Sequence, residues 1–140
     1  MGYTINPFTG SFQRTSTSAI SATKLKITRI AQEAITVSEV VKAFSSTQCA
    51  LATGDTIKAD AMVLGIADNS AAIGEDVDII LLGVVTDAIF SVFTLNDPLF
   101  LDEDGGITNV KRTSGFHVAV GKSLGGNDIL FQSSLPTVIA

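Results

Sequence analysis

The chain has little of the side-chain chemistry on which most enzymes depend. Its 140 residues include one cysteine, one histidine and no tryptophan. The lone Cys49 excludes an intrachain disulfide, and one cysteine with one histidine cannot complete a tetrahedral zinc site. His117 stands between Phe116 and Val118 in an apolar run, where a packed strand residue is expected rather than a catalytic base. We therefore predict no enzymatic activity, no cofactor and no metal, with Cys49 as a small buried residue.

Long apolar runs are also missing. No run approaches the roughly 18 residues that span a bilayer, and the amino terminus has no basic segment followed by an apolar one. We therefore expect no contact with a membrane and no signal peptide, and a soluble chain made in a cytoplasm. A chain of 140 residues is the size of one domain and buries a core without disulfides.

Charged side chains are few and unevenly distributed, with a net charge of −5. Residues 1–45 carry five basic and two acidic side chains, residues 46–104 carry one basic and eleven acidic, and residues 105–140 carry three basic and one acidic. No basic stripe with interleaved aromatic residues is present, which disfavours nucleic-acid binding. A basic amino-terminal segment is suited to lie on a neighbouring acidic subunit, although the acids also fit a plain solvated surface.

The amino-terminal residues 1–22 are predicted to form an extended docking arm in front of a single β domain, residues 23–140. The arm is rich in Ser, Thr and Gly, and "NPFTG" at 6–10 predicts a local turn because proline presets φ and glycine accepts a positive φ. Phenylalanines in such a polar arm are candidate anchors on a partner. The alternative is an arm that covers an edge strand of its own domain. The predicted partner-binding residues are Asn6, Pro7, Phe8, Gly10, Phe12 and Arg14.

The rest of the chain has the pattern of an all-β fold. "KLKITRI" (24–30) alternates with period two, as in a strand with one wet face. Residues 31–44 fit a strand or a short helix, and their β-branched side chains favour the strand. From residue 46 onward, short apolar runs are broken by Gly, Asp and Asn, among them "TIKAD" and "DAIFSVF". This punctuation predicts a small β-barrel or sandwich.

Two acidic stretches are interpreted as structural. Asp76 and Asp78 are predicted on the wet face of one strand, with Val77 and Ile79 on its other face. "DEDGG" (102–106) resembles the start of a calcium loop, but it lacks the later spaced ligands and the closing glutamate. We therefore predict a hairpin turn there.

A repeated hairpin element is present in the β domain. Three stretches return in the same order: "GDTIKAD" (54–60) as "NDPLFLD" (96–102), "VLGIA" (63–67) as "AVGKS" (119–123), and "GEDVDI" (74–79) as "GNDILF" (126–131). The repeat bears on Gly121-Lys122-Ser123, which has the form of the end of a phosphate-binding loop. The first glycine of such a loop would be residue 116, which is phenylalanine. We predict instead a turn between strands, with Gly121, like Gly65, serving a strand bend or tight backbone packing.

Several of these stretches resemble bacteriophage proteins. "INPFTG" (5–10) resembles a short element at the start of small phage structural proteins. "VLGIADNSAAIGEDVDIILLGVV" (63–85), "NDPLFLDEDGGIT" (96–108) and "GFHVAVGKSL" (115–124) together are similar to a family of small phage β-barrel virion proteins. The resemblance implies a capsid decoration (cement) protein, commonly a homotrimer, and alternatively a tail-fibre or baseplate attachment module.

The function expected from the resemblance agrees with the one expected from the residues. A small β domain without a cluster of reactive side chains, preceded by an arm with aromatic anchors, suits a protein that binds a surface. The implied partners are the major capsid protein or tail and baseplate proteins, and further copies of the chain. The implied location is the virion, after synthesis in the host cytoplasm. A β-barrel hydrolase is the competing class, although the chain has no tryptophan and one tyrosine with which to stack a sugar.

Overall fold

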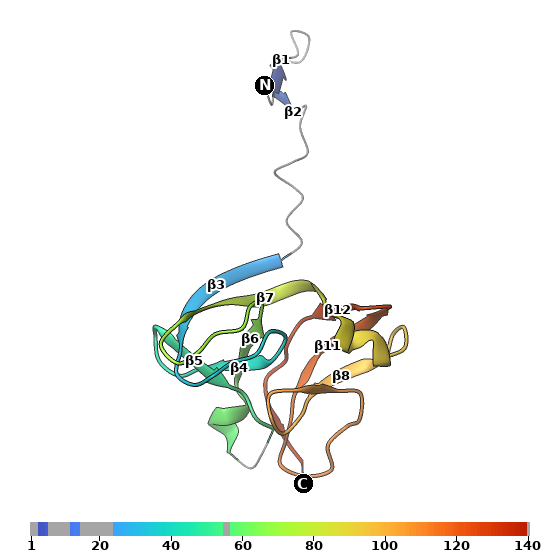
Figure 1. Cartoon of the computed structure of the whole chain (residues 1–140). Coiled ribbons are helices and arrows are strands. Elements are labelled where there is room, and N and C mark those ends of the chain that lie inside the picture. The colour runs from blue at the N-terminus through green and yellow to red at the C-terminus, as the bar shows by residue number, and fades with distance from the viewer. Residues whose placement is uncertain (1–2, 6–11, 15–23, 55–56, 140) are drawn as a thin grey trace.

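The computed structural model describes residues 3–5, 12–14, 24–54 and 57–139, and it shows an all-β protein built on a closed barrel of five strands (Figure 1). The barrel strands follow the order β3-β5-β4-β6-β7, and β3 pairs with β7 to close the ring. The β3–β5 pair is parallel and the other four pairs are antiparallel. The barrel strands are β3 (Lys24–Ala31), β4 (Val40–Ala43), β5 (Gln48–Leu51), β6 (Val63–Ala67) and β7 (Asp76–Thr86).

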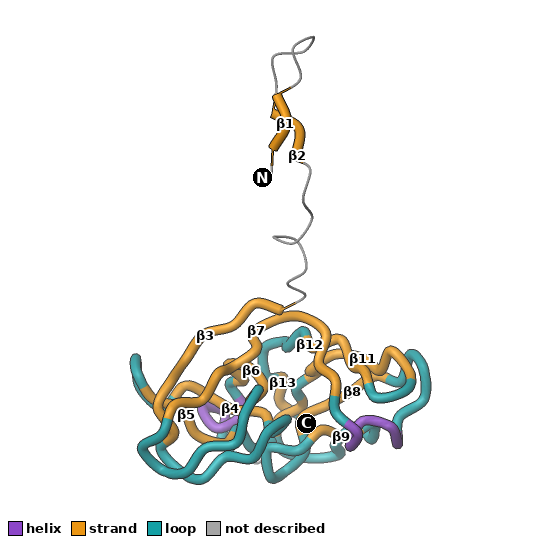
Figure 2. Tube along the Cα trace, turned by 45° about the horizontal axis from the view of Figure 1, so that its top comes forward, coloured by secondary structure: helices purple, strands orange, loops and turns teal. Residues whose placement is uncertain are grey.

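A second group of strands continues the sheet from the far end of β7. Residues Gly83 to Thr86 of β7 pair with β12, and the order runs on through β11 and β8 to β9. Figure 2 shows the barrel on one side of β7 and this group on the other. The added strands are β12 (Asp128–Phe131), β11 (Ala119–Gly125), β8 (Pro98–Leu101) and β9 (Ile107–Thr108).

The remaining elements are short. β10 (Phe116–His117) pairs with β13 (Thr137–Val138), and β1 (Tyr3–Ile5) pairs with β2 (Phe12–Arg14). Two 3₁₀ helices, η2 (Lys58–Ala61) and η3 (Ala88–Val92), lie where the apolar runs "TIKAD" and "DAIFSVF" predicted strands. No helix in the described ranges is long and apolar enough to cross a membrane.

The core is divided into two clusters by β4, β6 and β7. One cluster takes a residue from each barrel strand, including Val41 and Ile79, and fills the barrel. The other lies between the barrel and the second group of strands and includes Val40, Ile80 and Phe131. Because consecutive strand residues point to opposite faces, the pairs Val40/Val41 and Ile79/Ile80 put one side chain into each cluster. This double burial is the physical reason for the continuous apolar run in β7.

Small side chains suit the narrow interior of the barrel. Ala31, Cys49 and Ala67 are at most 1% exposed and lie in this cluster. Small groups at these positions leave room for the larger Val41 and Ile79 in the same cluster. The prediction that Cys49 is a small buried residue is confirmed, and burial raises the pKa of its thiol.

Several sequence predictions are confirmed strand by strand. Asp76 and Asp78 are exposed and alternate with the buried Val77 and Ile79. The 102–106 turn joins β8 to β9, with Leu101 paired to Ile107. In residues 31–44 the structure has the strand β4 and an isolated bridge at 35, and no helix.

The expected alternation of residues 24–30 is only partly realised. The segment is a strand, but Leu25 is 59% and Ile30 38% exposed. The pairing of β3 with β7 shifts register between Leu25 and Lys26, which interrupts the period of two.

The repeated element corresponds to two similar hairpins. β6 and β11 hold the matching glycines, and β7 and β12 are their antiparallel partners. A Cβ atom at Gly65 would lie 2.4 Å from the Ile80 carbonyl oxygen, and one at Gly121 would lie 1.8 Å from that of Leu130. Tight backbone packing is therefore confirmed as the role of both glycines. Gly121 to Ser123 lie within β11 rather than in a turn. The described residues of the first repeat pair do not share a structure, since 58–60 lie in η2 and 98–101 form β8.

Candidate functional site: an apolar groove beside the barrel

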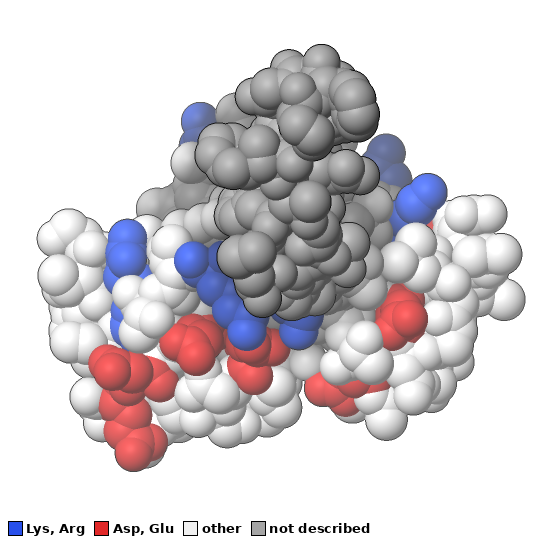
Figure 3. All heavy atoms as spheres, turned by 90° about the horizontal axis from the view of Figure 1, so that it is seen from above, with Lys and Arg blue, Asp and Glu red and all other residues white. Residues whose placement is uncertain are grey.

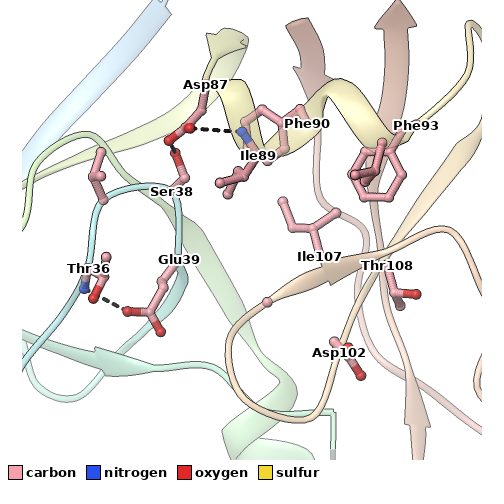
Figure 4. Close-up of a pocket in the computed structure, with 13 residues that line it drawn as sticks. Thr36, Ser38, Glu39, Asp87, Ile89, Phe90, Phe93, Asp102, Ile107 and Thr108 are labelled. Carbon is pink, nitrogen blue, oxygen red and sulfur yellow. Dashed lines mark hydrogen bonds between the residues drawn. The ribbon is translucent and has the colours of Figure 1, made fainter. Parts of the chain in front are cut away.

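A groove of about 720 Å³ opens between the barrel and the second group of strands (Figure 4). Three segments surround it: the loop 36–39 that leads into β4, the helix η3, and the β8–β9 hairpin. The hairpin is fixed against the barrel because the Val40 N–H donates to the Gly105 carbonyl at 2.7 Å. The lining residues are Thr36, Val37, Ser38, Glu39, Asp87, Ile89, Phe90, Val92, Phe93, Asp102, Gly106, Ile107 and Thr108.

The apolar part of the groove is a consequence of the 3₁₀ period. Residues three apart lie on the same face of a 3₁₀ helix. Phe90 is 1% exposed, and Phe93 packs against the same core cluster. Ile89 and Val92 form the other face and are 58% and 77% exposed. Together with the partly buried Ile107, they give the open side of the groove an apolar lining.

Asp87 holds the two sides of the groove together. Its Oδ1 accepts from the Ile89 N–H at 3.1 Å, which caps the amino end of η3, and its Oδ2 accepts from the Ser38 hydroxyl at 2.6 Å. Ser38 is 4% exposed and has a φ of 70°, which is unusual for a residue with a side chain. Its N–H donates to the Ala67 carbonyl at 2.8 Å, so this strained residue is fixed to the barrel on one side and to η3 on the other.

The polar residues give the groove a negative rim. Glu39 Oε1 accepts from the Thr36 N–H at 2.7 Å, and Asp102 Oδ1 accepts from the Glu103 N–H at 2.8 Å. With Asp87, these make three carboxylates, and no lysine or arginine is among the described residues that line the groove. Such a rim favours a cationic ligand.

The groove offers hydroxyl and carboxylate groups but no imidazole or thiol among its described lining residues. The Ser38 hydroxyl donates to a carboxylate rather than to a histidine. His117 lies in β10, with its ring 4.7 Å from that of Phe100. Burial, and then the charge of Lys111, lower its pKa. This arrangement suits binding of an apolar and cationic group better than nucleophilic catalysis.

The predicted arm residues are only partly described by the structure. Asn6, Pro7, Phe8 and Gly10 lie outside the described residues. Phe12 and Arg14 belong to β2, where they pair with Ile5 and Tyr3 of β1. The described part of the arm is therefore a pair of short antiparallel strands, and the predicted turn at 6–10 lies outside the described residues.

The basic residues at the start of β3 have partners within the domain. The Lys26 ammonium lies 2.5 Å from Asp68 Oδ2, and that of Lys24 lies 3.7 Å from Asp68 Oδ1. The hydrogen bond to Asp68 raises the pKa of Lys26. Figure 3 shows basic and acidic side chains next to each other on this face. Lys24 and Lys26 thus form ion pairs with Asp68 of their own domain, although exposed ion pairs of this kind contribute little to stability.

The groove itself was missed by the sequence reasoning. "DAIFSVF" (87–93) is one of the apolar runs from which the β fold is predicted, whereas its aspartate is a helix cap and its apolar residues recur every three positions. The spacing of three between apolar residues was the feature of the sequence that could have indicated a 3₁₀ helix here. No protein-family model and no curated protein matches the chain.

Proposed function

We propose that this protein is a structural protein of a bacteriophage virion, most simply a capsid decoration protein that binds other particle subunits. The observation that carries the binding role is the apolar groove, with Ile89 and Val92 on its open side. Exposed apolar side chains that gather at a concave site mark a binding surface. The phage context rests on the resemblance of residues 5–10, 63–85, 96–108 and 115–124. A tail-fibre or baseplate module would use the same surfaces.

Self-association is the second part of the proposal. Besides the groove, Leu25 and Leu82 are cross-strand partners on β3 and β7, and both are exposed, by 59% and 46%. An exposed leucine pair on paired strands is a natural contact for another copy. A homotrimer would present three arms, and each later arm would then dock at a high effective concentration. Native mass spectrometry at micromolar protein measures this directly, and a monomer alone would count against it.

Deletion of residues 2–14 tests whether the arm docks on another subunit. The melting temperature of the isolated protein should stay nearly unchanged, because the described body begins at Lys24 and has its own cores. Incorporation into particles that lack the protein should be lost. Phe8→Ala should weaken incorporation, with Thr9→Ala as the matched control in the same segment. Unfolding or aggregation of the truncated protein would show instead that the arm belongs to its own fold.

Imaging of the particles that take up the protein then separates the two locations. Density on the capsid lattice supports a decoration protein, and density at the tail supports the attachment module. Absence from both places, with a particle-free monomer in lysates, would overturn the proposal.

A further inference from the structure

We infer that the groove between η3 and the β8–β9 hairpin is the acceptor for the amino-terminal arm of a second copy of this chain. The inference rests on the proposed docking of the arm and names its partner. Phe12 or Phe8 of one copy would cover the apolar side of the groove of the next, with Arg14 at the negative rim. The copies would thereby be linked through their arms.

The apolar part of the groove has the right chemistry for a phenyl ring. Ile89 and Val92 are more than half exposed, and Ile107 is partly buried beside them. Figure 4 shows Ile89, Ile107 and Phe93 around the same space. An aromatic ring placed there would remove apolar surface from water on both partners and would stack against Phe93.

The charges of the two surfaces are complementary. Residues 1–23 contain one charged side chain, Arg14, and no acid. The rim of the groove carries Glu39, Asp87 and Asp102. Arg14 is two residues from Phe12, so both fall on the same face of an extended strand. A ring in the groove would therefore bring the guanidinium to the side of the carboxylates.

The arm is long enough for Arg14 to reach the groove of a neighbouring copy. Lys24, where the body begins, pairs with Gly83, and Asp87 lies four residues further along the chain. Four extended residues cover about 13 Å, whereas the ten steps from Lys24 back to Arg14 cover about 33 Å. The reach of the arm thus exceeds the distance from Lys24 to Asp87 by up to about 20 Å, which is enough to extend to a neighbouring copy.

Photo-crosslinking between light and heavy chains tests the inference on the full-length protein. A benzophenone amino acid in place of Phe12 is introduced into unlabelled chains, which are unfolded and refolded together with an excess of ¹⁵N-labelled chains of the natural sequence. We expect cross-linked peptides that join light residue 12 to heavy residues 88–93 or 107–108. Arg14→Glu should lower their yield about tenfold, the scale of one lost interfacial anchor.

A matched pair of surface variants controls for folding. Val92→Glu in the heavy chain should abolish the cross-links to η3, whereas Val110→Glu, at a valine 68% exposed outside the groove, should leave them intact. Circular dichroism should be unchanged for both. Cross-links within light chains only would show an arm in its own groove and overturn the inference. Cross-links elsewhere on the heavy chain would also overturn it, while the loss of virion incorporation on deletion of 2–14 would still support the proposed function.

Discussion

Replacement of Gly121 by alanine is expected to destabilise the protein by about 3–5 kcal/mol, because two costs combine at this position. Gly121 has a φ of +145°, a conformation that costs a residue with a side chain on the order of 1–3 kcal/mol. The new Cβ atom would also lie 1.8 Å from the Leu130 carbonyl oxygen and 2.9 Å from its carbon. These are backbone atoms of the paired strand β12, so no side chain can rotate away to make room.

Relief of the clash would require β11 to part from β12. Each ladder hydrogen bond lost contributes about 1 kcal/mol. The total is a large fraction of the roughly 5–15 kcal/mol by which an ordinary domain is stable. Urea unfolding followed by circular dichroism measures the loss as a lower midpoint at unchanged slope.

Gly126→Ala is the matched control in the same hairpin. Gly126 has a φ of +59°, and a Cβ atom there would meet nothing within 4 Å, so only the backbone cost of about 1–2 kcal/mol remains. Lys122→Ala, at an exposed position of β11, should change stability by less than about 0.5 kcal/mol. An equal loss for Gly121→Ala and Gly126→Ala would refute the claim that close strand packing requires Gly121.

Two further predictions concern pH and the groove. Burial and the charge of Lys111 lower the pKa of His117 from 6.5 in the folded protein. The unfolded chain therefore binds a proton at His117 more readily than the folded protein does. Stability should fall as the pH drops below about 6.5 towards the folded pKa. Melting temperatures at pH 7.5 and 5.5 should therefore differ more for the natural protein than for His117→Phe; equal differences would contradict this. Ser38→Ala should lower the free energy of unfolding by about 1–3 kcal/mol, because the Asp87 carboxylate loses its hydroxyl donor. Ser38→Gly should lower it less, because glycine adopts the positive φ without strain. The opposite order in urea unfolding would show that the strain at Ser38 is unimportant.

Local patterns in the sequence were sufficient to predict the structure of a segment where the residues of that segment alone indicate it. The alternation of Asp76, Val77, Asp78 and Ile79 predicts which face of β7 is exposed to solvent. The acids and glycines at 102–106 predict the hairpin turn between β8 and β9. The fold class follows from the repetition of such segments. The matching hairpins of β6–β7 and β11–β12 could be recognised because the same glycine is needed at the same kind of close approach.

The tertiary structure alone decided how these segments meet. Closure of the barrel depends on the parallel pairing of Ile30 with Gln48 and on the antiparallel pairing of β3 with β7, contacts between residues far apart that leave no local pattern. Ser38 and Asp87, 49 residues apart, form the bond that holds the two sides of the groove. The groove exists because folding brings a strained loop, a short helix and a hairpin together around one space. Its apolar residues were visible in the sequence, but their exposure depends on which neighbours the fold places over them.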